Sequence, residues 1–193
     1  METATPKQLD QERKWIEAAK KDPEAFEPIF QKYNSVIFNY ILRRTCDVAL
    51  AKDLTADTFL KALENLSRFH WRNVPFSAWL YRIATNEVKL HYRKNNRLSQ
   101  LSDERISRLK SDKLADDYLI RAENAVQENR QFQRMHRALK TLNMKYQTVL
   151  TLRYFENLSI RDIARIMDLS ENTIKTHIHR GIKHLKKAYE AAQ

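Results

Sequence analysis

The stretch LSIRDIARIMDLSENTIKTHIHRGIKHLKK, residues 158–187, decides the fold because it predicts two short helices joined by a three-residue break. Apolar residues recur at helical spacing along the first helix: Ile160, Ile163, Ala164 and Met167. Ser159, with Asp162 three residues later, forms a capping box that would start this helix. Asp168-Leu169-Ser170 breaks the pattern, and Ser170 is suited to cap the second helix. The stretch therefore predicts a helix-turn-helix.

The second helix of this pair has two unlike faces. Its apolar stripe is predicted to pack inward and consists of Ile174, Ile178, Ile182 and Leu185. Its opposite stripe is polar and basic and consists of Lys175, Thr176, His179, Arg180 and Lys183. Such side chains suit phosphates and base edges in the major groove, which is wide enough to admit a helix. The alternative is a solvated basic face on an ordinary helical hairpin. The short break and the basic second helix favour DNA.

The charge of the chain is unevenly distributed. The 193 residues carry a net charge of +11, which favours a polyanionic partner. Residues 1–95 hold 16 Lys/Arg against 12 Asp/Glu, and residues 127–193 hold 13 against 6. Residues 96–126 are neutral, with 6 of each. Two basic blocks separated by a neutral one indicate two modules that face nucleic acid.

Composition argues against several classes of function. The single cysteine, Cys46, rules out an internal disulfide and a multi-cysteine zinc site, and its apolar neighbours indicate a small buried hydrophobe. One glycine in the whole chain argues against a phosphate-binding loop, and no nucleophile–base cluster is evident, so we expect no enzyme and no cofactor. His177 and His184 lack a carboxylate or thiol to complete a ligand set, so we expect polar groups facing a groove and no metal site. No apolar run of about 18 residues and no signal peptide is evident, so we expect a soluble cytoplasmic protein.

The rest of the sequence predicts further helices and no strand. Helical patterns cover residues 8–20, the stretch after Pro23, and residues 47–66 and 76–94, which together predict a compact first domain, 1–95. Residues 96–126 are rich in charge and serine and predict an extended or partly helical linker. The second domain, 127–193, would place two more helices before the helix-turn-helix, with Asn157 in a left-handed conformation at a helix end.

Three segments resemble the extracytoplasmic-function (ECF) sigma factors of bacterial RNA polymerase, within the sigma-70 family. Residues 53–69, DLTADTFLKALENLSRF, resemble the sigma-2 helix that docks on the polymerase clamp. Residues 75–94, PFSAWLYRIATNEVKLHYRK, resemble the helix that melts the promoter and reads the −10 element. Residues 142–187 resemble the sigma-4 domain, which reads the −35 element. The resemblance implies an all-α fold in which small sigma-2-like and sigma-4-like helical domains are joined by a flexible linker.

The resemblance also implies functional residues in the first domain. On the docking helix Asp53, Ala56 and Asp57 lie where the family meets the polymerase clamp, although the family often has glutamine in place of Ala56. We expect Lys61 and Glu64 to be available on the same polar stripe. On the next helix the −10 reader would be one face, formed by Arg82, Asn86, Lys89 and Arg93. Aromatic and histidine side chains in and beside the preceding loop are candidates to hold unstacked bases: Phe69, His70, Trp71 and Phe76. We expect Trp79 to belong to the core.

The sequence therefore predicts a sigma factor that brings core RNA polymerase to promoter DNA and helps to melt the −10 region. Because many relatives are controlled by anti-sigma factors, an anti-sigma factor is a further candidate partner. The alternative function is a helix-turn-helix regulator that binds operator DNA as a dimer. Residues 53–94 favour the sigma factor, because they resemble clamp and −10 readers and carry no sign of a ligand pocket.

Overall fold

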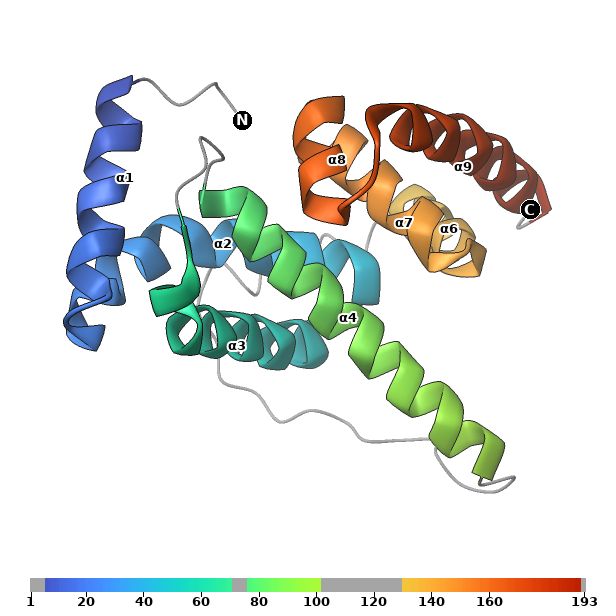
Figure 1. Cartoon of the computed structure of the whole chain (residues 1–193). Coiled ribbons are helices and arrows are strands. Elements are labelled where there is room, and N and C mark those ends of the chain that lie inside the picture. Colours follow the sequence, from blue (N-terminus) through green and yellow to red (C-terminus); the bar gives the residue numbers. More distant parts are fainter. Residues whose placement is uncertain (1–5, 71–75, 102–129, 192–193) are drawn as a thin grey trace.

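The computed structural model describes residues 6–70, 76–101 and 130–191, and these residues form helices with no β-strand among them (Figure 1). The N-terminal unit consists of α1 (Pro6–Ala19), the 3₁₀ turn η1 (Pro23–Phe26), α2 (Glu27–Thr45), α3 (Val48–Glu64), the 3₁₀ turn η2 (Leu66–Arg68) and α4 (Phe76–Leu101). The C-terminal unit consists of α6 (Arg130–Thr141), α7 (Met144–Leu150), the π-helical turn η3 (Thr151–Phe155), α8 (Ile160–Met167) and α9 (Glu171–Ala191). The all-α prediction is confirmed.

Helix α4 is longer than the sequence pattern predicted. It continues to Leu101, six residues into the range expected to be a linker. The rest of that range, from residue 102, lies outside the described residues. Local chemistry sets other helix boundaries: the Asp47 side chain accepts a hydrogen bond from the amide of Leu50 and so begins α3, and Cys46, with φ of 48°, ends α2. Burial raises the pKa of the Cys46 thiol to about 11, so the thiol stays protonated near neutral pH.

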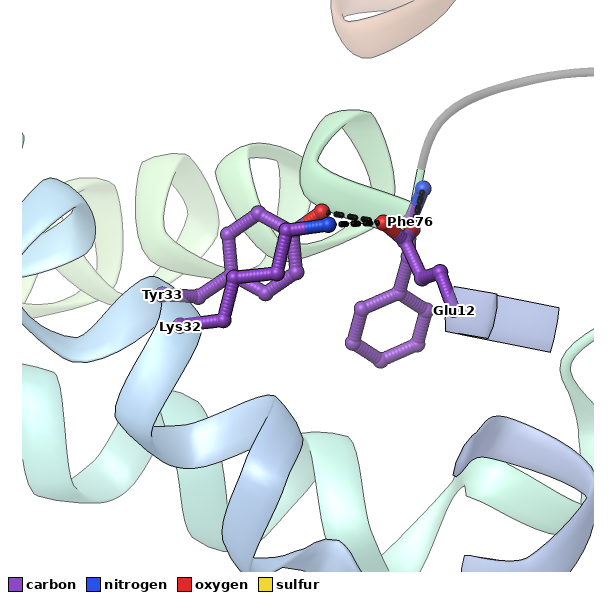
Figure 2. A network of polar contacts seen from close by, with 4 residues as sticks. All are labelled: Glu12, Lys32, Tyr33 and Phe76. Atoms are coloured by element: carbon purple, nitrogen blue, oxygen red, sulfur yellow. Dashed lines mark hydrogen bonds and ion pairs between the residues drawn. The ribbon is translucent and has the colours of Figure 1, made fainter. Parts of the chain in front are cut away.

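A buried carboxylate joins three helices of the N-terminal unit (Figure 2). Glu12 of α1 is 1% exposed and accepts hydrogen bonds from Lys32 Nζ at 2.6 Å and from the Tyr33 hydroxyl at 2.7 Å, both on α2. Its other oxygen accepts the backbone amide of Phe76 at 3.0 Å. That amide is one of the groups left unpaired at the start of α4, where the helix dipole also favours a negative charge. Glu12 therefore fixes the beginning of α4 relative to α1 and α2.

The C-terminal unit packs α9 against α7. Ile174 is fully buried, and Gly181 lies so close to α7 that a Cβ atom there would come within 3.3 Å of the Leu150 side chain. The prediction that Ile182 packs inward is wrong, since this side chain is 44% exposed. At 3.6 residues per turn, positions 181 and 182 flank the centre of the inner stripe, and the glycine occupies the closest approach of the two helices.

The two units lie against each other, with α8 beside α4 and with α6 and η3 beside α2 (Figure 1). Within the residues described, no helix is both long enough and apolar enough to span a membrane.

Candidate nucleic-acid and polymerase interface

The helix-turn-helix has the boundaries that the sequence predicted. Ser159 Oγ accepts the amide of Asp162 at 3.1 Å, and its hydroxyl donates to the Asp162 carboxylate at 2.6 Å. Asp168 ends α8 in the left-handed region, with φ of 57°. Ser170 Oγ accepts the amide of Thr173 at 3.1 Å and so begins α9. Both serine caps are confirmed, and they fix the angle at which α9 leaves the turn.

The exposed face of α9 is basic along most of its length. All five residues predicted to read DNA are exposed on it: Lys175, Thr176, His179, Arg180 and Lys183. The acidic residues of this helix, Glu171 and Glu190, lie at its two ends. Asn172, in the first turn, is also exposed and accepts the Thr176 hydroxyl at 2.9 Å on its carbonyl oxygen. Because the first turns of a recognition helix contact base edges, Asn172 joins the candidate set. Sequence reasoning left it out because it precedes the periodic polar stripe that begins at Lys175.

Two histidines of α9 lie against the Tyr146 ring of the C-terminal unit. His177 lies edge-on to the Tyr146 ring at 5.8 Å, and His184 stacks on the same ring at 5.3 Å. Burial, followed by the charges of Lys145 and Arg180, lowers the pKa of His177 and so favours the neutral ring. His177 is partly buried, so the expectation that it faces a groove is wrong, whereas His184 is exposed and its expected place in a groove stays a prediction. Among the described residues, no three potential metal ligands lie close enough together to hold an ion.

Helix α4 presents a second polar face. Arg82, Asn86, Lys89 and Arg93 are all exposed along it, as their spacing predicted. Burial, followed by the nearby charge of Arg44, lowers the pKa of Lys89. Trp71 lies outside the described residues.

The aromatic residues at the start of α4 form a cluster. Phe76 is completely buried, with Phe69 at 5.1 Å and Trp79 at 5.2 Å between ring centroids. The expectation that Phe76 could line a base pocket is wrong, because its ring is enclosed by these neighbours. Trp79, expected in the core, is only partly buried and lines two hollows.

These two hollows lie on either side of Trp79. One, of about 340 Å³, is bordered by Asn86 and Arg68. The other, of about 360 Å³, is lined by His70, Arg82 and, from the C-terminal unit, Arg165. Cations beside an aromatic wall suit an unstacked base and its phosphate. Sequence reasoning missed Arg68 and Arg165, because neither lies on the periodic face of α4.

Helix α3 carries the face predicted to meet polymerase. Asp53, Ala56 and Asp57 are exposed on one side, and Leu60, 57% exposed, continues the same line one turn later. Lys61 is not available as expected, since its ammonium pairs with the buried carboxylate of Glu87 on α4. Leu60 was missed, although an apolar residue four positions after Ala56 and three after Asp57 falls on the polar stripe. Leu60 therefore adds exposed apolar area to the face predicted to meet polymerase.

Family models match both units. The model of sigma-70 region 2 matches residues 29–98, within the N-terminal unit, and the model of sigma-70 region 4 matches residues 132–185, within the C-terminal unit. The helix-turn-helix and the basic face of α9 lie in the second match, and the polar faces of α3 and α4 lie in the first.

Three RNA polymerase sigma factors are similar to the chain in sequence. The ECF RNA polymerase sigma factor SigW of Bacillus subtilis is 33% identical over 180 residues, which cover 91% of this chain and 95% of SigW. The RNA polymerase sigma factor YlaC of the same organism is 31% identical over 86% of this chain and 93% of YlaC. The ECF RNA polymerase sigma factor BldN of Streptomyces coelicolor is 31% identical over 85% of this chain, but the match covers only 60% of BldN.

Two solved structures share the fold. The sigma factor RpoE of Bartonella quintana, solved in complex with the anti-sigma factor NepR, superposes with a TM-score of 0.63 at 22% identity, covering 87% of this chain and 98% of RpoE. CnrH, in complex with the cytosolic domain of CnrY, gives the same TM-score at 20% identity, covering 94% of this chain and 98% of CnrH.

Proposed function

Because the chain belongs to the extracytoplasmic-function sigma factors of RNA polymerase, we propose that its two helical units divide promoter recognition between them. The chain is an RNA polymerase sigma factor, and the alternative of an operator-binding regulator is not favoured. The C-terminal unit reads the −35 element, and the N-terminal unit binds core polymerase and opens the −10 region. The observation that carries this division is the presence of three exposed polar faces, on α3, α4 and α9, each separate from its unit's core.

The α9 face is the −35 reader. Arg180 and Lys175 present cations to phosphates and guanine edges, while Thr176, His179 and Asn172 offer smaller polar groups. Thr176 is already held by its hydrogen bond to the Asn172 carbonyl, so its side chain is oriented before DNA arrives.

The α4 face is the −10 reader. Asn86 borders the hollow beside Trp79, and an asparagine amide can both donate to and accept from a base edge. Arg82, Lys89 and Arg93 are exposed along the same helix and contact the phosphates of the DNA backbone. We assign Trp71 to base capture on its position in the sequence alone. Capturing an unpaired base costs a few kcal/mol, which stacking and phosphate contacts offset.

The α3 face docks on core polymerase through Asp53, Ala56, Asp57 and Leu60. Leu60 supplies apolar contact area on this face of α3, and Asp53 and Asp57 supply negative charges that can pair with basic residues of polymerase. In these roles the chain binds polymerase and DNA and catalyses no reaction itself. We place its action in the cytoplasm, where polymerase and promoter meet. Since RpoE of Bartonella quintana was solved with an anti-sigma factor, we include an anti-sigma factor among the partners.

A pull-down with core polymerase tests the docking face. Asp57→Arg reverses one charge at an exposed position and leaves the packing of α3 intact, so the variant should fold normally but lose core binding. Leu60→Ser should weaken binding by removing apolar contact area. Asp10→Arg, a charge reversal at an exposed site on α1, is the matched control and should bind like wild type. Full retention of binding by Asp57→Arg would exclude α3 as the docking helix.

A further inference from the structure

One carboxylate of the C-terminal unit is held entirely by side chains of the N-terminal unit. Glu156 follows η3, and its side chain is 8% exposed. Its Oε1 accepts Arg43 Nη1 of α2 at 2.6 Å, and its Oε2 accepts the hydroxyl of Tyr81 of α4 at 2.7 Å. Both oxygens therefore bind across the contact between the units, and substituting this side chain removes contacts between units and leaves the hydrogen bonds within its own unit in place.

Neighbouring contacts surround this carboxylate. The Arg43 guanidinium also lies 5.5 Å from the centre of the Phe155 ring, and Arg44 Nη2 lies 2.6 Å from Met144 Sδ. Tyr81 is completely buried and packs edge-on to Tyr40. Burial, followed by the charge of Glu156, raises the pKa of Tyr81, so its hydroxyl remains a donor at physiological pH. A buried carboxylate that accepts two charge-assisted hydrogen bonds holds the two units in one orientation. It is screened less by solvent than an ion pair on the surface.

The arrangement conflicts with simultaneous reading of two promoter elements. The −10 and −35 elements are about 25 base pairs apart, or about 85 Å along the duplex at 3.4 Å per base pair. In the structure Asp168, in the turn before the −35 helix, lies 3.4 Å from Arg82 on the −10 face. Helix α9 has 21 residues and is only about 31 Å long. The closed arrangement therefore cannot place α4 and α9 on both elements.

We propose that Glu156, Arg43 and Tyr81 form a latch that keeps the free chain closed, and that the latch must open before the two units can engage one promoter. The inference rests on the proposed function, since the conflict exists only if α4 and α9 read separate elements. Separation exposes Glu156 and Arg43 to water, and the hydration of both charges offsets part of the free energy lost with their ion pair. If the two units read separate elements on core polymerase, polymerase binds the open form better than the closed form and shifts the equilibrium toward opening.

Small-angle X-ray scattering of the free chain tests the latch without polymerase. A compact chain of 193 residues has a radius of gyration of about 16 Å, and wild type should lie near this value. Glu156→Arg places a cation against Arg43 and should raise the radius above about 20 Å, since two separated units no longer share one compact volume. Tyr81→Phe keeps the buried ring but removes one hydrogen bond, so it should give a smaller increase. Glu190→Arg, at an exposed site on α9, is the matched control and should stay compact.

A charge swap separates the latch from a general loss of structure. The double variant Arg43→Glu/Glu156→Arg restores opposite charges at the same positions and should return the radius toward wild type. Circular dichroism should show equal helix content in all variants. An extended wild type, or a compact Glu156→Arg, would overturn the latch.

Binding to core polymerase with promoter DNA tests the consequence. The apparent affinity for polymerase with promoter DNA is reduced by the fraction of the free chain that is open. If that fraction is about 1–10%, Glu156→Arg should raise the affinity by about tenfold, and by at most the reciprocal of the open fraction. The charge-swapped double variant should bind like wild type. An open Glu156→Arg that binds no better than wild type would overturn the inhibitory role. If scattering behaves as expected but wild type binds no polymerase at all, the latch stands and the proposed function fails.

Discussion

Removing the Glu12 carboxylate should destabilise the N-terminal unit far more than removing any exposed carboxylate of the same helix. Glu12→Ala takes away the common acceptor of Lys32, Tyr33 and the Phe76 amide (Figure 2). The Tyr33 hydroxyl and the Phe76 amide are buried, and each costs about 1–3 kcal/mol when left without a partner. The Lys32 side chain is 36% exposed, so water can solvate its ammonium after the carboxylate is removed and the cost for this group is small. The expected loss is therefore about 3–5 kcal/mol of unfolding free energy, a large fraction of the 5–15 kcal/mol typical of a domain.

The same helix provides the control. Glu17 on α1 is 56% exposed and pairs with Lys20 at 2.9 Å, so Glu17→Ala should change stability by less than about 1 kcal/mol. Glu12→Gln keeps an oxygen to accept the Phe76 amide but loses the charge, and should fall between the two alanine variants.

Urea unfolding followed by tryptophan fluorescence suits this measurement. All three tryptophans, Trp15, Trp71 and Trp79, lie in the first half of the chain, so fluorescence reports the N-terminal unit. With a denaturant slope of about 2 kcal/mol/M, Glu12→Ala should lower the midpoint by about 2 M. Equal midpoints for Glu12→Ala and Glu17→Ala would refute the role of Glu12 as the residue that joins α1, α2 and α4.

Three other predictions concern DNA reading and pH. Asn86→Ala should reduce open-complex formation, measured by permanganate reactivity of the melted strand, more than closed-complex binding; equal losses would indicate a structural role for Asn86. Arg180→Ala should flatten the preference for the cognate −35 element by about 1–3 kcal/mol, whereas Lys186→Ala on the same helix should not, and a loss of one common factor on all promoters would assign Arg180 to phosphate. Burial and Glu12 raise the pKa of Tyr33, so the unfolded chain loses this proton first as pH rises above about 10 and stability falls by about 1.4 kcal/mol per pH unit. Tyr33→Phe should reduce that alkaline slope in urea titrations, and an unchanged slope would contradict the assignment.

Features that depend on neighbours in sequence were predictable. The caps at Ser159 and Ser170 and the left-handed Asn157 follow from side-chain chemistry within three residues, and the structure has all of them. The exposed face of α9 likewise follows from helical periodicity. An ambiguity of one residue was enough to misplace Ile182, because only the contact with Leu150 shows that Gly181 holds the inner position.

Features that depend on distant partners were not predictable. Glu12 looks like any surface carboxylate in an amphipathic helix, and its amide partner lies 64 residues away. Lys61 has the spacing of an exposed residue, yet Glu87 on the next helix pairs with it. Glu156 gave no signal at all, since its donors come from the other unit. Burial of a charge is decided by tertiary partners, which the periodicity of one helix does not contain.

Run-off transcription with purified core polymerase tests the central claim most directly. Core polymerase alone, and the chain alone, should give no specific transcript from a cognate promoter, and the two together should give one defined start. Asp57→Arg should abolish this transcript and Asp10→Arg should preserve it. Tight, dimeric, sequence-specific binding of the free chain to duplex DNA, with no transcript when core polymerase is added, would contradict the account.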